Sequence, residues 1–519
     1  MRFALAVIVV AWFAVLFTRP LYRADESRYA EISREMVASG DWVTPRLNGF
    51  KYFEKPPLQY WTTAAFFKVF GEHDVVARLW NALCGFAAML LALVAARRLY
   101  GPGAGLYAAA ALAASPLFVV LGQLNTLDMG FALFMAGAIF AFSLGHVLLF
   151  WAACALAVLS KGLAGIVLPL GTVALYILVR QDWQRIRRLQ WLKGGALFLL
   201  ISAPWFIAVS LANDEFARFF FIREHFERFT TGVHRREQPP WYFVAVLAIG
   251  MGTVLLPALA GWWRGLRAGL VESAPRFDVS LFLALWISVV LGFFSLSSSK
   301  LPAYILPAFP ALAVLAAAHM ATTSDRRLFL AQSAIMVIVG AALAALSQRF
   351  APFSPYVLAA GACLAAGGVA AALFAWRSRI MPWLAATMIA GFVATQIGIA
   401  GHAAGFADRL SVKSTVDMLP QRPPPEAAVF ALDAYDHTMP WYLRRPVTMV
   451  AGKDELGLSI EWEPQKYIPD MESFRRAWHA APQAYAFVDA VRYDTMREAY
   501  GVPMQLLARG ARYVIVKKP

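Results

Sequence analysis

The chain has 519 residues, of which 60% are hydrophobic and only 15% are charged, and its mean hydropathy is +0.57. Soluble domains usually carry about 25% charged residues, so this composition excludes an ordinary water-soluble enzyme. The formal net charge of +15 would suit a protein that binds nucleic acid, but the basic residues lie between apolar stretches. Basic residues in such positions indicate membrane orientation, and we expect a lipid bilayer rather than nucleic acid as the partner.

Apolar stretches of roughly 17–25 residues, the length that crosses a bilayer, recur from Phe3 to Ala400. In chain order they predict helices at Phe3–Phe17, Val75–Ala96, Ala104–Leu121, Met129–Leu159, Leu163–Val179, Gly194–Leu211, Trp241–Trp263, Val279–Leu296, Leu301–Ala318, Leu328–Leu346, Tyr356–Trp376 and Met381–Ala400. As one helix, Met129–Leu159 would be about 46 Å long, against a bilayer core of about 30 Å. Because Ser143, Gly145 and His146 interrupt it, we predict two short helices there, and thirteen in total.

The distribution of basic residues supports this count. With the N-terminus in the cytoplasm, thirteen spans place on the cytoplasmic side Arg97, Arg98, Arg180, Arg185, Arg187, Arg188, Lys193, Arg264, Arg267, Arg276, Arg326, Arg327, Arg377 and Arg379. A single span over Met129–Leu159 would move every cluster from Arg180 onward to the outside, against the positive-inside rule. We therefore expect a multi-pass protein of the bacterial inner membrane.

Two soluble segments fall on the outer, periplasmic side: a long first loop, residues 18–74, and a C-terminal tail, residues 402–519. The tail alternates short apolar runs with helical stretches, at Ala427–Leu432, Met471–Ala480, Tyr485–Val488, Tyr493–Tyr500 and Tyr513–Val516. This alternation predicts a small α/β domain. We divide the chain accordingly into a transmembrane catalytic domain, residues 1–401, and a soluble domain, residues 402–519.

Ionisable residues gather on the outer side of the predicted helices. They are Asp25, Glu26, Arg28, Tyr52, Glu54 and Lys55 in the first loop; Asp128 and Lys161 at the next two connections; Arg223, Glu224, His225, Arg228, His234, Arg235 and Arg236 in the loop before Trp241; and Lys300 and Tyr304 near the tenth helix. Charges that converge at membrane depth usually mark a functional site. We therefore predict an active site at the periplasmic face.

Each of these residues also has a purely structural interpretation. Asp25 can cap the helix predicted after it, and Asp128 can cap the one that begins at Met129. Lys55 can extend its ammonium to the lipid headgroups, and Tyr304 can anchor the chain at the interface. Local sequence leaves these alternatives open, and only the gathering of the residues on one side favours function.

Several motifs resemble a known family. The segments that carry the resemblance are Arg23–Met36, Ser39–Trp42, Lys51–Pro56, Thr126–Asp128, Ser160–Gly162 and Ser299–Pro307. They are similar to segments of the aminoarabinose lipid A transferases, which belong to the GT-C superfamily together with the protein O-mannosyltransferases. The resemblance covers the membrane part thoroughly and the tail only loosely. It implies a polytopic α-helical membrane protein with the GT-C fold.

The resemblance also implies an activity and a set of site residues. The donor would be a sugar, 4-amino-4-deoxy-L-arabinose, on undecaprenyl phosphate, and the acceptor would be a lipid A phosphate or another envelope glycan. It assigns Asp25 as the catalytic carboxylate, Asp128 as a second, sugar-orienting acid, and Lys55 as the cation that faces the departing phosphate. The implied substrate-binding residues are Glu26, Arg28, Tyr52, Lys161, Arg228, Lys300 and Tyr304. Glu54 and His225 match a pair that holds a divalent metal such as zinc, although no cofactor is implied as a requirement.

Two rival classes offer a different interpretation. A secondary transporter places its charges near the bilayer midplane and contains a repeat, whereas these charges gather at one face and the sequence contains no repeat. A protein O-mannosyltransferase remains the alternative, because its first-loop signature is the same. Its acceptor is a hydroxyl group, whereas Arg223, Arg228, Arg235 and Arg236 favour an anionic phosphate acceptor.

Overall fold

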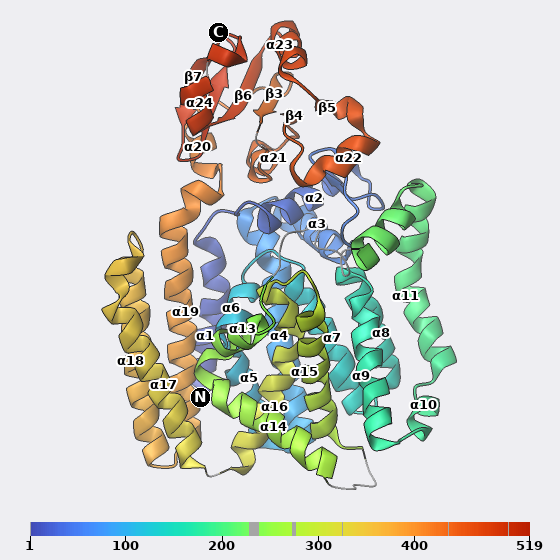
Figure 1. Cartoon of the computed structure of the whole chain (residues 1–519), viewed down its shortest axis with the longest axis vertical. Coiled ribbons are helices and arrows are strands. Elements are labelled where there is room, and N and C mark those ends of the chain that lie inside the picture. Colours follow the sequence, from blue (N-terminus) through green and yellow to red (C-terminus); the bar gives the residue numbers. More distant parts are fainter. Residues whose placement is uncertain (1, 228–237, 272–276, 324, 434, 497) are drawn as a thin grey trace. The chain divides into compact units, whose positions relative to one another are not determined.

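A computed structural model describes residues 2–519 apart from 228–237, 272–276, 324, 434 and 497 (Figure 1). The chain divides into two compact units. The first unit comprises Met1–Leu16, Lys55–Gln59 and Arg78–Gly401, and the second comprises Phe17–Glu54, Tyr60–Ala77 and His402–Pro519. The second unit thus groups the first loop with the C-terminal tail, which the sequence-based division had assigned to different domains.

The first unit is built from helices. In chain order the structure contains α1 (Arg2–Ala14), η1 (Val15–Phe17), α4 (Asp74–Tyr100), α5 (Pro102–Ala113), α6 (Pro116–Gly122), α7 (Asp128–Ser143), α8 (Val147–Lys161), α9 (Ala164–Arg180), α10 (Gln184–Arg188), α11 (Trp191–Ala212), η2 (Arg218–Glu227), α13 (Tyr242–Met251), η3 (Gly252–Val254), α14 (Leu255–Val271), α15 (Val279–Leu296), η4 (Pro302–Ala308), α16 (Phe309–Thr322), α17 (Arg326–Ala345), η5 (Ser347–Phe350), α18 (Ser354–Trp376) and α19 (Ile380–Leu410).

The lengths and compositions of these helices make the protein a multi-pass membrane protein. Within the described ranges, eight helices are long and apolar enough to cross a membrane, or up to nine if one bent pair forms a single span. Four further apolar helices, of 10–17 residues each, occupy Ile8–Phe17, Asp128–Ser143, Val147–Lys161 and Ala164–Arg180. The predicted apolar segments are therefore all present and in the predicted order. The predicted count of thirteen membrane-spanning helices holds only approximately.

The predicted division of Met129–Leu159 is confirmed. Helix α7 ends at Ser143 and α8 begins at Val147, and Gly145 adopts φ 81° in the turn between them. Glycine adopts this left-handed conformation without the steric cost that other residues meet. The two helices pack together and run in opposite directions, so the start of α7 and the end of α8 lie at the same end of the first unit.

The single helix predicted over Ala104–Leu121 is broken in the structure into a bent pair, which can still form one span. The chain forms two helices there, α5 and α6, which meet at an angle of 72°. Pro116 is the cause, because a proline ring clashes with the preceding turn and supplies no backbone N–H. Ser115 compensates in part, since its hydroxyl donates to the carbonyl oxygen of Ala111 at 2.7 Å.

The tail folds as the predicted α/β domain. Its six strands are β3 (Ala428–Leu432), β4 (Thr448–Val450), β5 (Tyr467–Ile468), β6 (Ala484–Asp489), β7 (Gln505–Arg509) and β8 (Tyr513–Lys517), in the order β5-β4-β3-β6-β8-β7. Strands β5, β4, β3 and β6 are parallel, and β8 is antiparallel to both β6 and β7. The three predicted apolar runs correspond to β3, β6 and β8, whereas β4, β5 and β7 were not predicted.

Helices complete the second unit. They are α2 (Asp25–Ser39), α3 (Leu58–Phe70), α20 (Lys413–Asp417), α21 (Thr438–Leu443), η6 (Asp454–Leu456), α22 (Gly457–Trp462), η7 (Pro464–Lys466), α23 (Met471–Ala480), α24 (Ala490–Met496) and η8 (Glu498–Tyr500), with a small hairpin of β1 (Arg46–Leu47) and β2 (Phe50–Lys51). Phe474 and Trp478 of α23 are fully buried against Phe430 of β3. Helix α2 packs against α21, so the sheet domain also supports the helix that begins at Asp25.

The close approach of α9 to α8 gives a test of how the first unit holds Lys161, the last residue of α8. A Cβ atom added at Gly165 would lie 2.5 Å from the backbone nitrogen of Val158, whereas one added at Gly171, in the same helix, would meet nothing within 4 Å. We expect Gly165→Ala to cost about 1–3 kcal/mol of stability through overpacking and to lower the melting temperature in detergent. Gly171→Ala is the matched control and should have the melting temperature of the wild type. Equal melting temperatures for all three proteins would contradict this packing.

Candidate functional site

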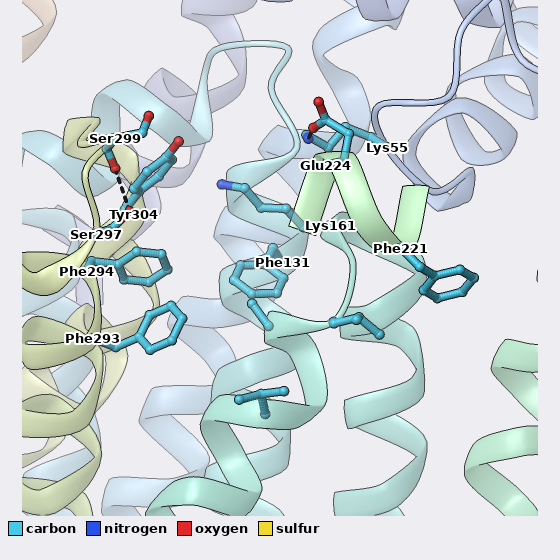
Figure 2. A pocket seen from close by; sticks show the side chains of 13 residues that line it. Lys55, Phe131, Lys161, Phe221, Glu224, Phe293, Phe294, Ser297, Ser299 and Tyr304 are labelled. Atoms are coloured by element: carbon cyan, nitrogen blue, oxygen red, sulfur yellow. Dashed lines mark hydrogen bonds and ion pairs between the residues drawn. The ribbon is translucent and has the colours of Figure 1, made fainter. Parts of the chain in front are cut away.

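A cavity of about 380 Å³ opens in the first unit (Figure 2). It is lined by Lys55, Phe131, Lys161, Leu163, Ala164, Val167, Phe221, Glu224, Phe293, Phe294, Ser297, Ser299 and Tyr304. Figure 2 shows Lys55 and Glu224 close together at one side, Lys161 extending toward Tyr304, and the rings of Phe293 and Phe294 farther along the same wall as Tyr304. The cavity therefore combines two ammonium groups with a largely aromatic and aliphatic wall.

Lys161 is held in place by the end of its helix and by an acidic partner. Gly162 ends α8 with φ 107° and ψ −161°, a conformation open almost only to glycine. The Lys161 ammonium forms an ion pair with Asp128, the first residue of α7, and lies 5.0 Å from the centre of the Tyr304 ring. Asp128 makes no side-chain cap to its helix, so the capping alternative for this residue is wrong.

Lys55 is paired with a carboxylate that the motifs did not assign. Its Nζ lies 3.2 Å from Oε2 of Glu224, and the two side chains are only 15% and 6% exposed. Glu224 comes from η2, a π-helical segment that also supplies Phe221 to the cavity. Lys55 is therefore held by a carboxylate of the cavity, and its side chain lines that cavity.

Lys300 and Tyr304 come from the segment that leads into η4. Tyr304 lines the cavity, and so does Ser299, whereas Lys300 does not. The Lys300 side chain is nevertheless buried, with 8% exposed, and forms no ion pair with any residue in the described ranges. A buried ammonium without a carboxylate beside it is costly, so Lys300 is suited to an anionic ligand.

Asp25 lies in the second unit, at the start of α2. The residue before the helix is Ala24, with φ 64°, and no side chain caps the helix; the interpretation of Asp25 as a helix cap is therefore wrong. Its carboxylate is 49% exposed and accepts a hydrogen bond from Nη1 of Arg28 at 3.1 Å. Asp25 is thus oriented by a neighbour on its own helix and remains open on its other side.

Arg28 connects Asp25 to the C-terminal sheet domain within the same unit. Its Nη2 donates to Glu455 at 2.5 Å, and the other carboxylate oxygen of Glu455 pairs with Nε2 of His437. Burial opposes ionisation of Glu455, but the hydrogen bond to His437 and the charges of His437 and Arg28 outweigh it and lower the pKa of Glu455 to about 2. No sequence motif pointed to His437 or Glu455.

Three tyrosines adjoin this network. Tyr29, Tyr52 and Tyr60 are buried, and burial raises the pKa of each hydroxyl well above its usual value. The hydroxyl groups of Tyr52 and Tyr60 have no hydrogen-bond partner among the residues that the structure describes. Buried hydroxyls usually find a partner, so these two are suited to a polar ligand. The placement of Tyr52 is consistent with its predicted substrate-binding role.

The remaining predicted site residues are placed as follows. Glu26 forms a buried ion pair with Arg19 at 2.8 Å and accepts from the backbone of Tyr22, so its carboxylate supports the loop itself. Arg228 lies outside the described residues, and so does the side chain of His225, although its backbone belongs to η2. In the described part of the chain no group of three or more His, Cys, Asp or Glu could hold a metal ion. The pairing of Glu54 with His225 stays a prediction.

Comparisons with known proteins address the chain as a whole. Residues 415–518 match the family described as "Aminoarabinose transferase C-terminal domain", and residues 54–207 match the family described as "Dolichyl-phosphate-mannose-protein mannosyltransferase". A Pseudomonas aeruginosa protein named "Undecaprenyl phosphate-alpha-4-amino-4-deoxy-L-arabinose arabinosyl transferase" is 31% identical over 535 residues, covering 95% of this chain and 92% of that protein. The chain belongs to the aminoarabinose transferase family.

Other members of the aminoarabinose transferase family agree with this assignment. A protein of the same name from Edwardsiella ictaluri is 34% identical over 338 residues, which span 61% of this chain and 59% of that protein. The crystal structure of ArnT from Cupriavidus metallidurans bound to undecaprenyl phosphate matches with a TM-score of 0.92 at 34% sequence identity, over 99% of this chain and 97% of that one. The similarity thus includes both the helical part and the C-terminal domain.

Asp25 provides the most direct test of the family's implied catalytic carboxylate. Because Asp25 caps no helix, Asp25→Asn should leave the protein folded while turnover falls by at least roughly a hundredfold, the low end for a positioned catalytic group. Turnover and melting temperature of the purified protein measure the two effects separately. Glu472→Gln, which changes an exposed carboxylate in the first turn of α23, is the control, and near-wild-type turnover of Asp25→Asn would remove this residue from the site.

A second carboxyl group on α2 makes stability depend on pH. Glu35 is buried, and burial together with repulsion from Glu31 raises its pKa to about 8 from an ordinary 4.5. The folded protein therefore holds a proton that the unfolded chain releases, so this contribution to stability is complete below about pH 4.5 and is lost as pH rises through about 8. We expect the melting temperature to fall between pH 6 and pH 9, and Glu35→Gln to reduce that fall. An unchanged pH profile in this variant would contradict the assignment.

Proposed function

We propose that this protein transfers 4-amino-4-deoxy-L-arabinose from undecaprenyl phosphate to a phosphate group of lipid A. The observation that carries the proposal is the cavity of the first unit, in which Lys55 and Lys161 face a wall of aromatic and aliphatic side chains. A polyprenyl phosphate has the same division, with an anionic head and a hydrocarbon chain. The names of the P. aeruginosa and E. ictaluri relatives supply the sugar.

The donor phosphate is proposed to bind between Lys55 and Lys161, with its isoprenoid chain along Phe293 and Phe294. Charge-assisted hydrogen bonds from ammonium groups to phosphate oxygens are among the stronger polar interactions in proteins. Apolar contacts contribute roughly 25 cal/mol for each Å² of hydrocarbon surface removed from water. Binding of undecaprenyl phosphate by the similar C. metallidurans protein supports this placement.

The transfer breaks the bond between the anomeric carbon and the phosphate oxygen, and forms a bond from the same carbon to an acceptor oxygen. Negative charge develops on the departing phosphate, and a preorganised cation such as Lys55 stabilises it. Positive charge develops on the sugar ring, and we propose Asp25 as the carboxylate that stabilises it. A lipid A phosphate is already anionic at neutral pH, so it needs less proton removal than a hydroxyl acceptor does.

The acceptor is proposed to bind at the loop before Trp241. Arg223 is exposed on η2, and Arg228, Arg235 and Arg236 of the same loop lie outside the described residues. Guanidinium groups bind phosphate with two parallel hydrogen bonds, which supports a phosphate rather than a hydroxyl acceptor. A divalent ion at Glu54 and His225 is a separate proposal, and none of the steps above passes through it. Metal analysis of the purified protein checks it.

We further propose that the cavity and the C-terminal domain face the periplasm, with the protein in the inner membrane. The basic clusters support this orientation. Arg97 and Arg98 end α4, Arg180 ends α9, and Arg326 and Arg327 begin α17. Arg180, for example, lies at the far end of α9 from Lys161, which ends α8 just before α9 begins. Basic residues favour the cytoplasmic side, which leaves the cavity on the other side.

The proposed activity is tested in a bacterial strain that lacks its own transferase but still makes the donor lipid. Expression should add aminoarabinose to lipid A, measured by mass spectrometry, and should raise polymyxin tolerance because the cationic sugar lowers the negative surface charge. Lys55→Ala is the matched impaired variant, in which modification should fall roughly tenfold to a hundredfold, since the change removes an interaction worth about 1.5–3 kcal/mol. Unmodified lipid A, together with hexose on secreted proteins, would favour a protein O-mannosyltransferase instead.

The orientation is tested by labelling single cysteines with an impermeant thiol reagent. Val491, on α24 of the C-terminal domain, is 71% exposed and is predicted to face the periplasm. Gln184, on α10, is also exposed and lies in a connection that is predicted to face the cytoplasm. In a background without Cys84, Cys154 and Cys363, Val491→Cys should react in intact spheroplasts and Gln184→Cys only after lysis. The reverse pattern would invert the proposed topology.

A further inference from the structure

A second, smaller cavity lies in the first unit where α17 and α19 begin and α18 ends (Figure 1). Its volume is about 50 Å³, and its lining includes Arg326, Phe329, Ser378, Arg379 and Trp383. The described lining residues of the two cavities do not overlap. The proposed transfer therefore gives this second cavity no role.

The wall of the second cavity is fixed by close packing of the helices around it. A Cβ atom added at Gly340 of α17 would lie 2.5 Å from the backbone nitrogen of Ala365 in α18, and small residues commonly bring membrane helices this close. Nearer the cavity, the rings of Phe329 and Trp383 are buried with their centres 4.7 Å apart. Nε1 of Trp383 donates to the Ser333 hydroxyl at 3.0 Å. The aromatic wall is therefore held in one arrangement.

Two arginines line this aromatic wall. Arg326 begins α17, and its guanidinium carbon lies 4.0 Å from the centre of the Trp376 ring, whereas Arg379 immediately precedes α19. Neither forms an ion pair with a carboxylate of the residues that the structure describes. The neighbouring acid, Asp325, accepts from two backbone N–H groups of α17 instead. The two guanidinium groups are therefore suited to an anion from outside the chain.

The second cavity lies where an apolar span meets its polar flank. Trp376 is the last residue of α18 and is 64% exposed, and tryptophan is enriched at the level of the lipid headgroups. Val369 and Leu373, one turn apart on the same helix, are 51% and 60% exposed. An anion that also carries hydrocarbon could therefore place its charge in the cavity and its chains along α18.

We propose that this second cavity binds the phosphodiester headgroup of an anionic phospholipid, such as phosphatidylglycerol. Arg326 and Arg379 bind the phosphate oxygens, the Ser378 hydroxyl adds a hydrogen bond, and the acyl chains lie along α18. Basic pockets between membrane helices are known to take anionic headgroups. A zwitterionic phospholipid has the same phosphate, but its ammonium group would be repelled by two arginines that have no acidic partner.

The test measures lipid binding by the purified full-length protein in detergent, with native mass spectrometry as the readout. Arg326→Gln with Arg379→Gln removes both arginines of the cavity. We expect the affinity for phosphatidylglycerol to fall about fivefold for each arginine removed, the effect of about 1 kcal/mol. Arg327→Gln with Arg377→Gln is the matched control, because it makes the same change of charge at two exposed neighbours that do not line the cavity. This control should lose roughly threefold or less, since only screened attraction is removed.

Equal losses in the two double variants would overturn the proposal, because they would show a diffuse attraction of lipid to basic residues. Arg326→Lys with Arg379→Lys keeps both charges and guards against a folding defect. It should bind phosphatidylglycerol more tightly than the glutamine variant does, and equally weak binding would contradict the role of the two charges.

A competition experiment on the wild type needs no variant. Phosphatidylglycerol should displace a bound labelled phosphatidylglycerol at least several-fold better than phosphatidylethanolamine does, since only the first lipid has a net negative charge. Glycerophosphoglycerol, the same headgroup without acyl chains, should compete weakly. Equal competition by the two phospholipids would overturn the preference for an anionic lipid, and equal competition by glycerophosphoglycerol would show a site for soluble phosphodiesters instead.

Discussion

The neutralisation of buried charge is the interaction on which the rest of this structure depends. In the first unit, Lys55 and Lys161 project into a cavity whose wall is mainly aromatic and aliphatic, and each ammonium has a carboxylate partner. A lone ammonium in such surroundings would cost several kcal/mol. The ion pairs therefore allow two cations to be kept beside an apolar wall, where the anionic head and the hydrocarbon chain of the proposed donor would bind.

The second unit also neutralises a buried charge, but it does so with one arginine between two carboxylates. Arg28 is buried, and it divides its guanidinium between Asp25 of its own helix and Glu455 of the sheet domain. Glu455 also pairs with His437, so the sheet domain supplies one of the two carboxylates that balance Arg28 and holds that carboxylate in place. Asp25 then makes one bond to Arg28 and keeps about half of its side chain exposed. The C-terminal domain thus takes part in orienting the helix that carries the proposed catalytic carboxylate.

Local signals in the sequence predicted much of this protein, and non-local contacts account for what was missed. Apolar length and the spacing of arginines identified the helices in order, including the turn after Ser143. Hydropathy is averaged over many residues, so it could not detect the bend before Pro116. Motifs identified Lys55, Lys161 and Tyr304, which the cavity brings together. Glu455 was missed because it is separated from its partner Arg28 by 427 residues, and such a pair leaves no pattern along the chain.

The different uses of lysine and arginine follow from the same electrostatics. Among the described residues that line the cavity, the basic ones are lysines, whose compact ammonium can leave one oxygen ligand for another without a fixed geometry. Arg28 instead holds two carboxylates at once with its planar fork, a geometry that favours permanence over exchange. Lys55 and Lys161 therefore each hold one carboxylate beside the cavity, whereas Arg28 holds two carboxylates of the second unit in a fixed geometry.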